Sequence, residues 1–364
     1  MNTKTRVLVS ASSHQDTLKD ALAALIEKGD IDAVFALGET KQKGRYCYSL
    51  ITDPSLVRKT LPFHPVMPVQ GARALSDMTI TRSFDRPVAA LLRPCEIRAF
   101  VENVKQSQGS LENIFIISCT CPGVIPASEL HREDRSDVLA NRTENIRKAC
   151  RVCTEFIPGQ QADMTVLIAS DEPNDSTVIY LNTERSVEIA SKLESPSLKT
   201  APPLPELTSG ILESRSKSLK DMIREIPAPE DGLQSLVSLF SACIGCRGCR
   251  EACPLCSCIL CDYETARTQH SPELIRTESK RKGSVRVPSG TIQFQLGRLM
   301  HISPVCTACG QCSDVCPADI PVADIFIRAA YLVQQSLDYT PGRDTDDTPP
   351  MATYIEKELL DITD

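Results

Sequence analysis

The sequence predicts an α/β domain followed by a mostly helical, cysteine-rich domain. Apolar strand patterns alternate with helical patterns over the first 195 residues, and this alternation is typical of an α/β fold with a largely buried sheet. A proline-rich segment then interrupts the alternation. Beyond residue 236 the chain carries eleven of its seventeen cysteines. A chain of 364 residues is also too long for one ordinary core.

Periodicity places the elements of the first domain. Leu18, Leu22 and Leu25 fall on one face of a helix over residues 16–29, which Asp16 can cap and Gly29 can end. An apolar strand follows at 31–37. We expect further strands at 47–52, 87–92, 113–118, 165–170 and 177–181, and helices at 96–106 and 184–193.

Composition divides the chain into four segments. They are an α/β domain at 1–195, a proline-rich linker at 196–235, a helical domain at 236–335 and an acidic tail at 336–364. The linker is predicted from SPSLKTAPPLPEL and EIPAPEDG, because proline at that density favours an extended connector.

Charge and hydropathy exclude several classes of function. The net charge is −7, and the one dense basic run is short, so nucleic acid is not an expected partner. No signal-peptide pattern and no run of eighteen apolar residues occurs, which predicts a cytoplasmic protein without a membrane span. Because a reducing cytosol opposes disulfides, the seventeen cysteines should be metal ligands or redox thiols.

The second domain repeats one cysteine pattern. Both copies read C-x-x-C-x-x-C-x-x-x-C-P, the bacterial ferredoxin signature, in which three thiolates hold one 4Fe-4S cluster and the fourth crosses to the other. Paired zinc sites are the alternative, but zinc has no use for the third cysteine or for the proline. The expected sets are Cys243, Cys246 and Cys249 with Cys316, and Cys306, Cys309 and Cys312 with Cys253.

Three more cysteines follow the first run in CPLCSCILC. Cys256, Cys258 and Cys261 can be alternative ligands, part of a further cluster, or buried thiols that pack beside the clusters. Their spacing does not choose between these roles. Cys47 lies outside every pattern and is expected to be a half-buried strand residue.

The first domain has its own set of four thiols. Cys119 and Cys121 end an apolar strand in SCTC, and Cys150 and Cys153 form the pair in KACRVC. Four thiolates are enough for one 4Fe-4S cluster or for a structural zinc. The company of two ferredoxin-type clusters favours the iron–sulfur interpretation.

A strand, a turn and a helix meet at RPCE, residues 93–96. Pro94 is well tolerated at a helix start, and the free N–H groups there can bind a cofactor. Glu96 would repel a pyrophosphate, so contact with a flavin ring, a ribityl chain or adenosine is the better expectation. The alternative is that Cys95 is a buried filler and Glu96 complements the helix dipole. No G-x-G-x-x-G fingerprint supports a standard NAD site.

RPCEIRAF, NIFIISCTCPG and KACRVC together resemble the beta subunits of deazaflavin-linked hydrogenases and formate dehydrogenases. CREACPLCSCILC and LGRLMHISPVCTACGQCSDVCPADIPV resemble the branch with a C-terminal dicluster domain. The resemblance implies an FAD-binding domain lined by Arg93, Pro94, Cys95 and Glu96. It also implies a nearby 4Fe-4S cluster on Cys119, Cys121, Cys150 and Cys153. In this family the ferredoxin motif often precedes the flavin domain, whereas here it follows.

These observations predict an oxidoreductase subunit. We expect it to pass electrons between FAD and three 4Fe-4S clusters, with CPLCSCILC leaving room for a fourth. The partners implied by the resemblance are subunits of formate dehydrogenase, hydrogenase or heterodisulfide reductase type. The alternative is a flavin-free iron–sulfur relay and docking subunit. A zinc-organised scaffold is the third hypothesis.

Overall fold

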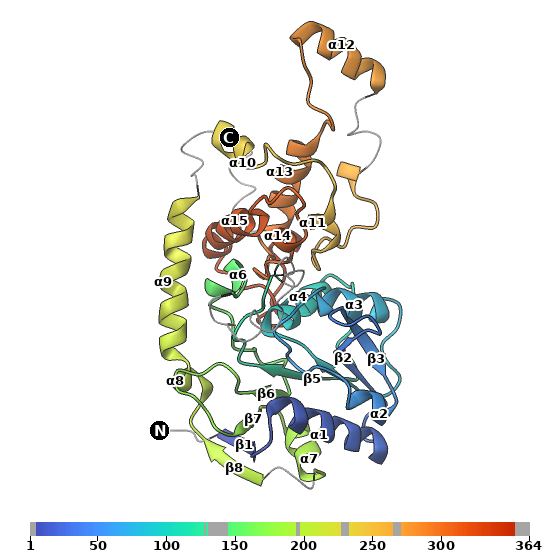
Figure 1. Cartoon of the computed structure of the whole chain (residues 1–364), viewed down its shortest axis with the longest axis vertical. Helices are drawn as coiled ribbons and strands as arrows, with labels where there is room; N and C mark the ends of the chain where they lie inside the picture. Colours follow the sequence, from blue (N-terminus) through green and yellow to red (C-terminus); the bar gives the residue numbers. More distant parts are fainter. Residues whose placement is uncertain are drawn as a thin grey trace.

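The computed structural model describes residues 5–126, 129, 145–193, 197–226, 233–264 and 271–353. The chain folds as a mixed α/β protein in which helices of the C-terminal half cover one end of a sheet domain (Figure 1). The sheet has eight strands in the order β3-β2-β4-β5-β6-β7-β1-β8. The predicted fold class therefore agrees with the structure at this level: an α/β part is followed by a helical part.

The centre of the sheet is parallel and its two edges are antiparallel. Strands β2, β4, β5 and β6 run parallel to one another, while β3 joins one side and β7, β1 and β8 join the other as antiparallel strands. The bounds are β1 Thr5–Ser10, β2 Ala33–Glu39, β3 Tyr46–Ile51, β4 Val88–Leu91, β5 Ile114–Cys119, β6 Met164–Val166, β7 Thr177–Leu181 and β8 Ser197–Ala201.

Both faces of the central strands are buried, and successive side chains of one strand point to opposite faces. On β5, Phe115 and Ile117 enter the core that includes Leu18 and Leu22, whereas Ile114 and Ile116 enter the core on the other face. The helices around the sheet are α1 His14–Lys28, α2 Pro54–Val57, α3 Gly71–Thr79, α4 Pro94–Lys105 and α7 Glu184–Ser191.

The first helix differs from its prediction at one end. Ser13 is the N-cap, because its side-chain oxygen accepts a hydrogen bond from the backbone N–H of Asp16 at 3.1 Å. Asp16, the predicted cap, instead lies in the first turn. Gly29 ends the helix in the left-handed conformation, as predicted, with φ of 78°.

The segment expected to be an extended linker contains regular structure. Its first residues form β8, and after α8 (Leu204–Leu207) the 17-residue helix α9 (Ser209–Glu225) runs along the molecule (Figure 1). Arg215 of α9 explains part of this order, because its guanidinium stacks on the Phe156 ring at 4.5 Å and donates to the carbonyl oxygen of Cys121 at 3.1 Å.

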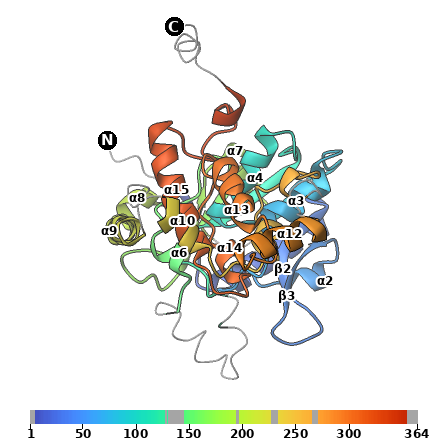
Figure 2. The same cartoon turned by 90° about the horizontal axis from the view of Figure 1, so that it is seen from above.

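The helical part shares an apolar core with one face of the sheet. Ile97 and Phe100 of α4 belong to the same buried cluster as Phe294 and Phe326, and Figure 2 shows this part stacked over the sheet domain. Its α-helices are α10 Leu233–Leu239, α11 Gly248–Glu251, α12 Pro272–Lys282, α13 Thr291–Ile302, α14 Gln311–Asp314 and α15 Val322–Ser336; short 3₁₀ turns lie at Asp262–Glu264 and Pro350–Ala352. The short helix α6 (Lys148–Arg151), between β5 and β6 in the chain, packs against α15.

The chain after α15 returns to the sheet domain. Glu102 of α4 is fully buried and accepts hydrogen bonds from the Tyr339 hydroxyl and the Gly342 backbone N–H, each at 2.6 Å. The start of the predicted acidic tail is therefore a packed segment, and residues 354–364 lie outside the described residues. Among the helices that the structure describes, none has the length and apolar character needed to cross a bilayer.

Candidate redox site

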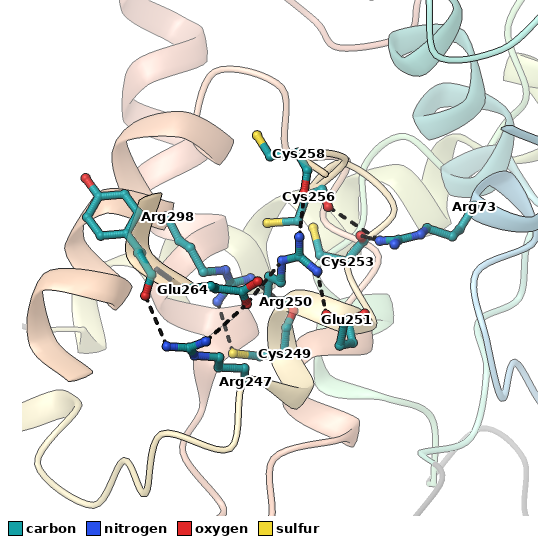
Figure 3. Close-up of polar contacts among 11 residues, drawn as sticks. Arg73, Arg247, Cys249, Arg250, Glu251, Cys253, Cys256, Cys258, Glu264 and Arg298 are labelled. Atoms are coloured by element: carbon teal, nitrogen blue, oxygen red, sulfur yellow. Dashed lines mark hydrogen bonds and ion pairs between the residues drawn. The ribbon is translucent and has the colours of Figure 1, made fainter. Parts of the chain in front are cut away.

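The first ferredoxin run wraps around the short helix α11. Gly245 and Arg247 both adopt positive φ, which bends the backbone tightly between successive cysteines. Cys249 is buried, and its Sγ accepts a hydrogen bond from the Arg298 guanidinium at 3.1 Å (Figure 3). Gln295 donates to the same sulfur at 3.7 Å. Helix α13 therefore supplies a charged and a neutral donor to this thiol.

The second run forms the same kind of turn around α14, which packs against α11. Ala308 donates its backbone N–H to Cys306 Sγ at 3.4 Å, and Gly310 has a φ of 79°. Val315, one residue before Cys316, lies 3.4 Å from the position of a Cβ at Gly248. The structure thus brings the last cysteine of the second run close to the first run, where the ferredoxin pattern expects it.

Buried donors without partners surround these thiols. Arg298 Nε and Thr307 Oγ1 have no hydrogen-bond partner among the described residues, and both residues are almost fully buried. Such donors are costly unless an acceptor reaches them, and the sulfides of an iron–sulfur cluster are acceptors. The residues present therefore fit the predicted clusters.

A cysteine of the second run needs a bound metal to become a thiolate. Burial raises the pKa of the Cys306 thiol to about 11. This thiol would be neutral near pH 7 unless bound metal favours its thiolate.

The first-domain thiols lie where β5 and α6 meet. Cys121 follows β5 and receives hydrogen bonds on its sulfur from the Cys119 thiol and from Arg93 Nη1, the latter at 3.6 Å. These donors, led by Cys119, hold the pKa of Cys121 well below its usual range. Cys150 and Cys153 lie near enough to Cys121 for the charges of these thiols to affect one another. Burial raises the pKa of Cys153 to about 12.

The turn at 93–96 is a buried helix cap. Glu96 is fully buried, and its carboxylate accepts hydrogen bonds from Tyr48 Oη at 2.8 Å, from the Gly71 backbone N–H at 2.8 Å and from the Arg93 backbone N–H at 2.9 Å. This arrangement closes the start of α4, with Pro94 in its first turn. Burial raises the pKa of Glu96. Glu96 therefore organises the turn, and the flavin role of residues 93–96 stays a prediction.

Cys95 is the part-exposed member of this turn. The electrostatic neighbours of its sulfur include Cys121, Cys153 and Cys309. Cys95 thus lies near both the first-domain thiols and the second ferredoxin run.

Arg147 joins the same two groups. Its guanidinium donates to the carbonyl oxygen of Cys309 at 2.7 Å and forms a buried ion pair with Asp314. Arg147 stands three residues before Cys150, so the loop that carries the KACRVC pair is fixed to α14. Cys150 and Cys309 lie on either side of this Arg147 contact, near enough for the charge of one thiol to affect the other.

Sequence reasoning missed Arg147, Arg298 and Gln295 as site residues. A partial signal existed for two of them, because Gln295 and Arg298 are three residues apart on one helix and so share a face. Arg147 is separated from Cys309 by 162 positions, and no local pattern relates them.

No family model matches the chain. The sequence is 27% identical to "F420-dependent formate dehydrogenase subunit beta" of Methanocaldococcus jannaschii over 381 residues, covering 90% of this chain and 91% of that protein. It is 26% identical to "F420-dependent formate dehydrogenase 1 subunit beta" of Methanococcus maripaludis, covering 90% of each.

A chain of the F420-reducing [NiFe] hydrogenase complex from Methanosarcina barkeri aligns with a TM-score of 0.47 and 15% identity, covering 64% of this chain and 94% of that one. The curated relatives confirm the family resemblance that the RPCE turn and the cysteine motifs predict. Over nine-tenths of its length, this chain is similar to the beta subunits of two F420-dependent formate dehydrogenases.

Proposed function

We propose that this chain is the electron-transfer subunit of a redox complex, passing electrons between FAD, 4Fe-4S clusters and a partner subunit. The observation that carries the proposal is the contiguity of the thiols. Cys121, Cys150 and Cys153 adjoin Cys309 through the Arg147 joint. Cys312 of the second run in turn neighbours Cys249 of the first.

The predicted ligands support one cluster in the first domain and two in the helical part. Cys121, Cys150 and Cys153, with Cys119 as the predicted fourth, would hold the first. Each ferredoxin run would hold three corners of its own cluster and one corner of the other. Bound clusters would supply one-electron transfer. The chain's own residues provide hydrogen bonds to sulfur, exclusion of water and fixed spacing between the sites.

A flavin would supply the junction between two-electron hydride exchange and these one-electron carriers. The names of the relatives suggest coenzyme F420, a deazaflavin, as the hydride partner and a formate dehydrogenase catalytic subunit as the protein partner. Both assignments are part of the proposal. Cys95 is the residue of the RPCE turn that remains part-exposed, and it adjoins the first-domain thiols.

One observation favours the alternative of a flavin-free relay. The Glu96 carboxylate is occupied by the Tyr48, Gly71 and Arg93 donors. Arg93 is also buried, with one guanidinium nitrogen on the carbonyl oxygen of His64. Neither side chain is available to a flavin in this conformation.

The test uses anaerobically purified protein and its heat-released supernatant. The leading proposal predicts a flavin spectrum in the supernatant and bleaching of the protein's visible absorbance when reduced F420 is added. The relay alternative predicts no released flavin, cluster bleaching by dithionite, and no response to reduced F420. A colourless protein that contains zinc alone would contradict both.

A further inference from the structure

A cavity of about 310 Å³ lies beside the first ferredoxin run. Three cysteines that belong to neither ferredoxin pattern line it: Cys256, Cys258 and Cys261. His301, near the end of α13, lines it as well. Four side chains with metal-binding atoms therefore border one space that the proposed clusters do not use.

The loop that carries the three cysteines is held in place by arginines. Arg250 donates from Nη2 to the Cys258 carbonyl oxygen at 2.6 Å, and Arg73 reaches the carbonyl oxygens of Cys253 and Cys256, each at 3.4 Å (Figure 3). Backbone carbonyls, rather than thiols, take these hydrogen bonds. The loop is thus fixed through its backbone.

The electrostatics of the cavity suit an anionic group. Arg250 and Arg298 line it, and both are buried. Arg250 is paired with Glu251 and Glu264. The Arg298 guanidinium donates hydrogen bonds to Cys249 and Gln295 rather than to a carboxylate, so its charge can offset a negatively charged group in the cavity. A cluster ligated by thiolates is negatively charged.

The dimensions favour a cluster over a single ion. A 4Fe-4S cluster holds its ligands farther apart, around a core that a space of about 310 Å³ can accommodate.

We propose that Cys256, Cys258 and Cys261, with His301 as the fourth ligand, hold an additional 4Fe-4S cluster beside the two ferredoxin-type clusters. The inference rests on the proposed function, because it extends the same electron path. The Cys256 thiol donates a hydrogen bond to that of Cys253, an expected ligand of the second cluster. Cys258 is exposed, and the neighbouring Ile259 and Leu260 are 88% and 90% exposed. The additional cluster would therefore sit between the ferredoxin pair and the surface.

The first experiment measures iron and acid-labile sulfide on the anaerobic full-length protein and on a Cys258→Ser/Cys261→Ser variant. The proposal predicts about sixteen irons per chain in the wild type and a loss of about four in the variant. Cys47→Ser is the matched control, because Cys47 is an exposed thiol on the distant strand β3, and this variant should keep the wild-type iron. A double variant with unchanged iron overturns the proposal.

A second measurement avoids the risk that the variant misfolds. Iodoacetamide is added anaerobically to the wild-type protein, and mass spectrometry reads the labelling of Cys258 and Cys47. Because both are exposed, a free Cys258 should react as Cys47 does. The proposal predicts protection of Cys258 in the iron-loaded protein and labelling after the iron is removed. Labelling of both in the loaded protein contradicts it.

The two proposals fail in different ways. About twelve irons with a reactive Cys258 would overturn the additional cluster and leave the electron-transfer function intact. A protein without iron at any cysteine set would overturn both.

Discussion

Arg147 and Cys309 are joined by a hydrogen bond of 2.7 Å between a guanidinium nitrogen and a backbone carbonyl oxygen, 162 positions apart in the chain. The same guanidinium pairs with Asp314, and both side chains are almost fully buried. This contact fixes the loop that bears the first-domain thiols to the second ferredoxin run. Arg147 therefore helps to fix the separation of the two proposed cluster sites.

Replacing Arg147 by lysine should slow electron transfer between the first domain and the ferredoxin clusters. A lysine ammonium cannot reproduce the forked contacts to Cys309 and Asp314. We expect the free energy of unfolding to fall by about 1–3 kcal/mol as well. Stopped-flow reduction and urea unfolding measure the two effects. Arg151→Lys, a change at an exposed residue of the short helix α6 that Arg147 precedes, is the control. Equal rates in both variants would remove Arg147 from the electron path.

Arg298 should raise the reduction potential of the cluster at Cys249. Its guanidinium contacts Cys249 Sγ at 3.1 Å, and positive charge favours the reduced, more negative cluster. Arg298→Gln should lower that potential by an amount on the order of 60 mV, a tenfold change for a one-electron couple. Arg298→Lys, which retains the charge, should restore most of it. A redox titration monitored by EPR spectroscopy measures the reduction potential of this cluster. An unchanged potential in the glutamine variant would argue against the effect.

Gly342→Ala should destabilise the return of the chain onto α4. Gly342 has a φ of 66°, and a Cβ there would lie 2.1 Å from the Arg98 carbonyl oxygen. Gly283 is the matched control, because it also has positive φ but no atom within 4 Å of the added carbon. Both variants carry the left-handed strain of about 1–2 kcal/mol, and the overlap should cost Gly342→Ala about 1–3 kcal/mol more. Equal urea midpoints would show that this contact does not form in solution.

Asp171 should make the stability of α9 dependent on pH. Its carboxylate accepts hydrogen bonds from the backbone N–H groups of Gly210 and Ile211, each at 2.9 Å, and these contacts lower its pKa from the ordinary value of 3.8. The stabilisation is therefore present above the unfolded-state pKa and lost as the pH falls through the lower folded-state pKa.

The measurement compares unfolding of wild type and Asp171→Asn across acidic pH. The gap between them should be largest near neutral pH and should close as the solution is acidified. Asp175→Asn, an exposed carboxylate in the same loop, serves as the control. A gap that persists at the acid end would assign the effect to something other than the charge of Asp171.

Local patterns predicted most of the sheet, including its edge strand β3, but missed the two strands at the opposite side. Strand β7 lies at residues 177–181 as predicted. All five of its residues are buried, so the strand appears in the sequence as a nearly continuous apolar run. Strands β1 and β8 were not predicted. In β8, four of five side chains are exposed, and its position depends on pairing with β1 at a separation of almost 200 residues. An edge strand of this kind has no apolar period to detect.

The residues of the candidate site also divide into those that local sequence patterns indicate and those that they do not. The two ferredoxin runs can be recognised in the sequence because the four cysteines of each run lie within one short segment, and their role as cluster ligands stays a prediction. The role of Glu96 was only an alternative at the sequence level, since its partners Tyr48 and Gly71 are 48 and 25 positions away. The arginines that contact these cysteines lie far from them in the sequence, so no local spacing indicates the contacts.

The measurement that tests the central claim most directly is the content of iron, acid-labile sulfide and flavin per chain of anaerobically purified protein. The account predicts at least about twelve irons with matching sulfide, together with about one FAD. The proposed additional cluster raises the expected iron to about sixteen. About eight irons and no flavin would contradict the account, because it would leave two ferredoxin-type clusters on a domain without a redox centre of its own.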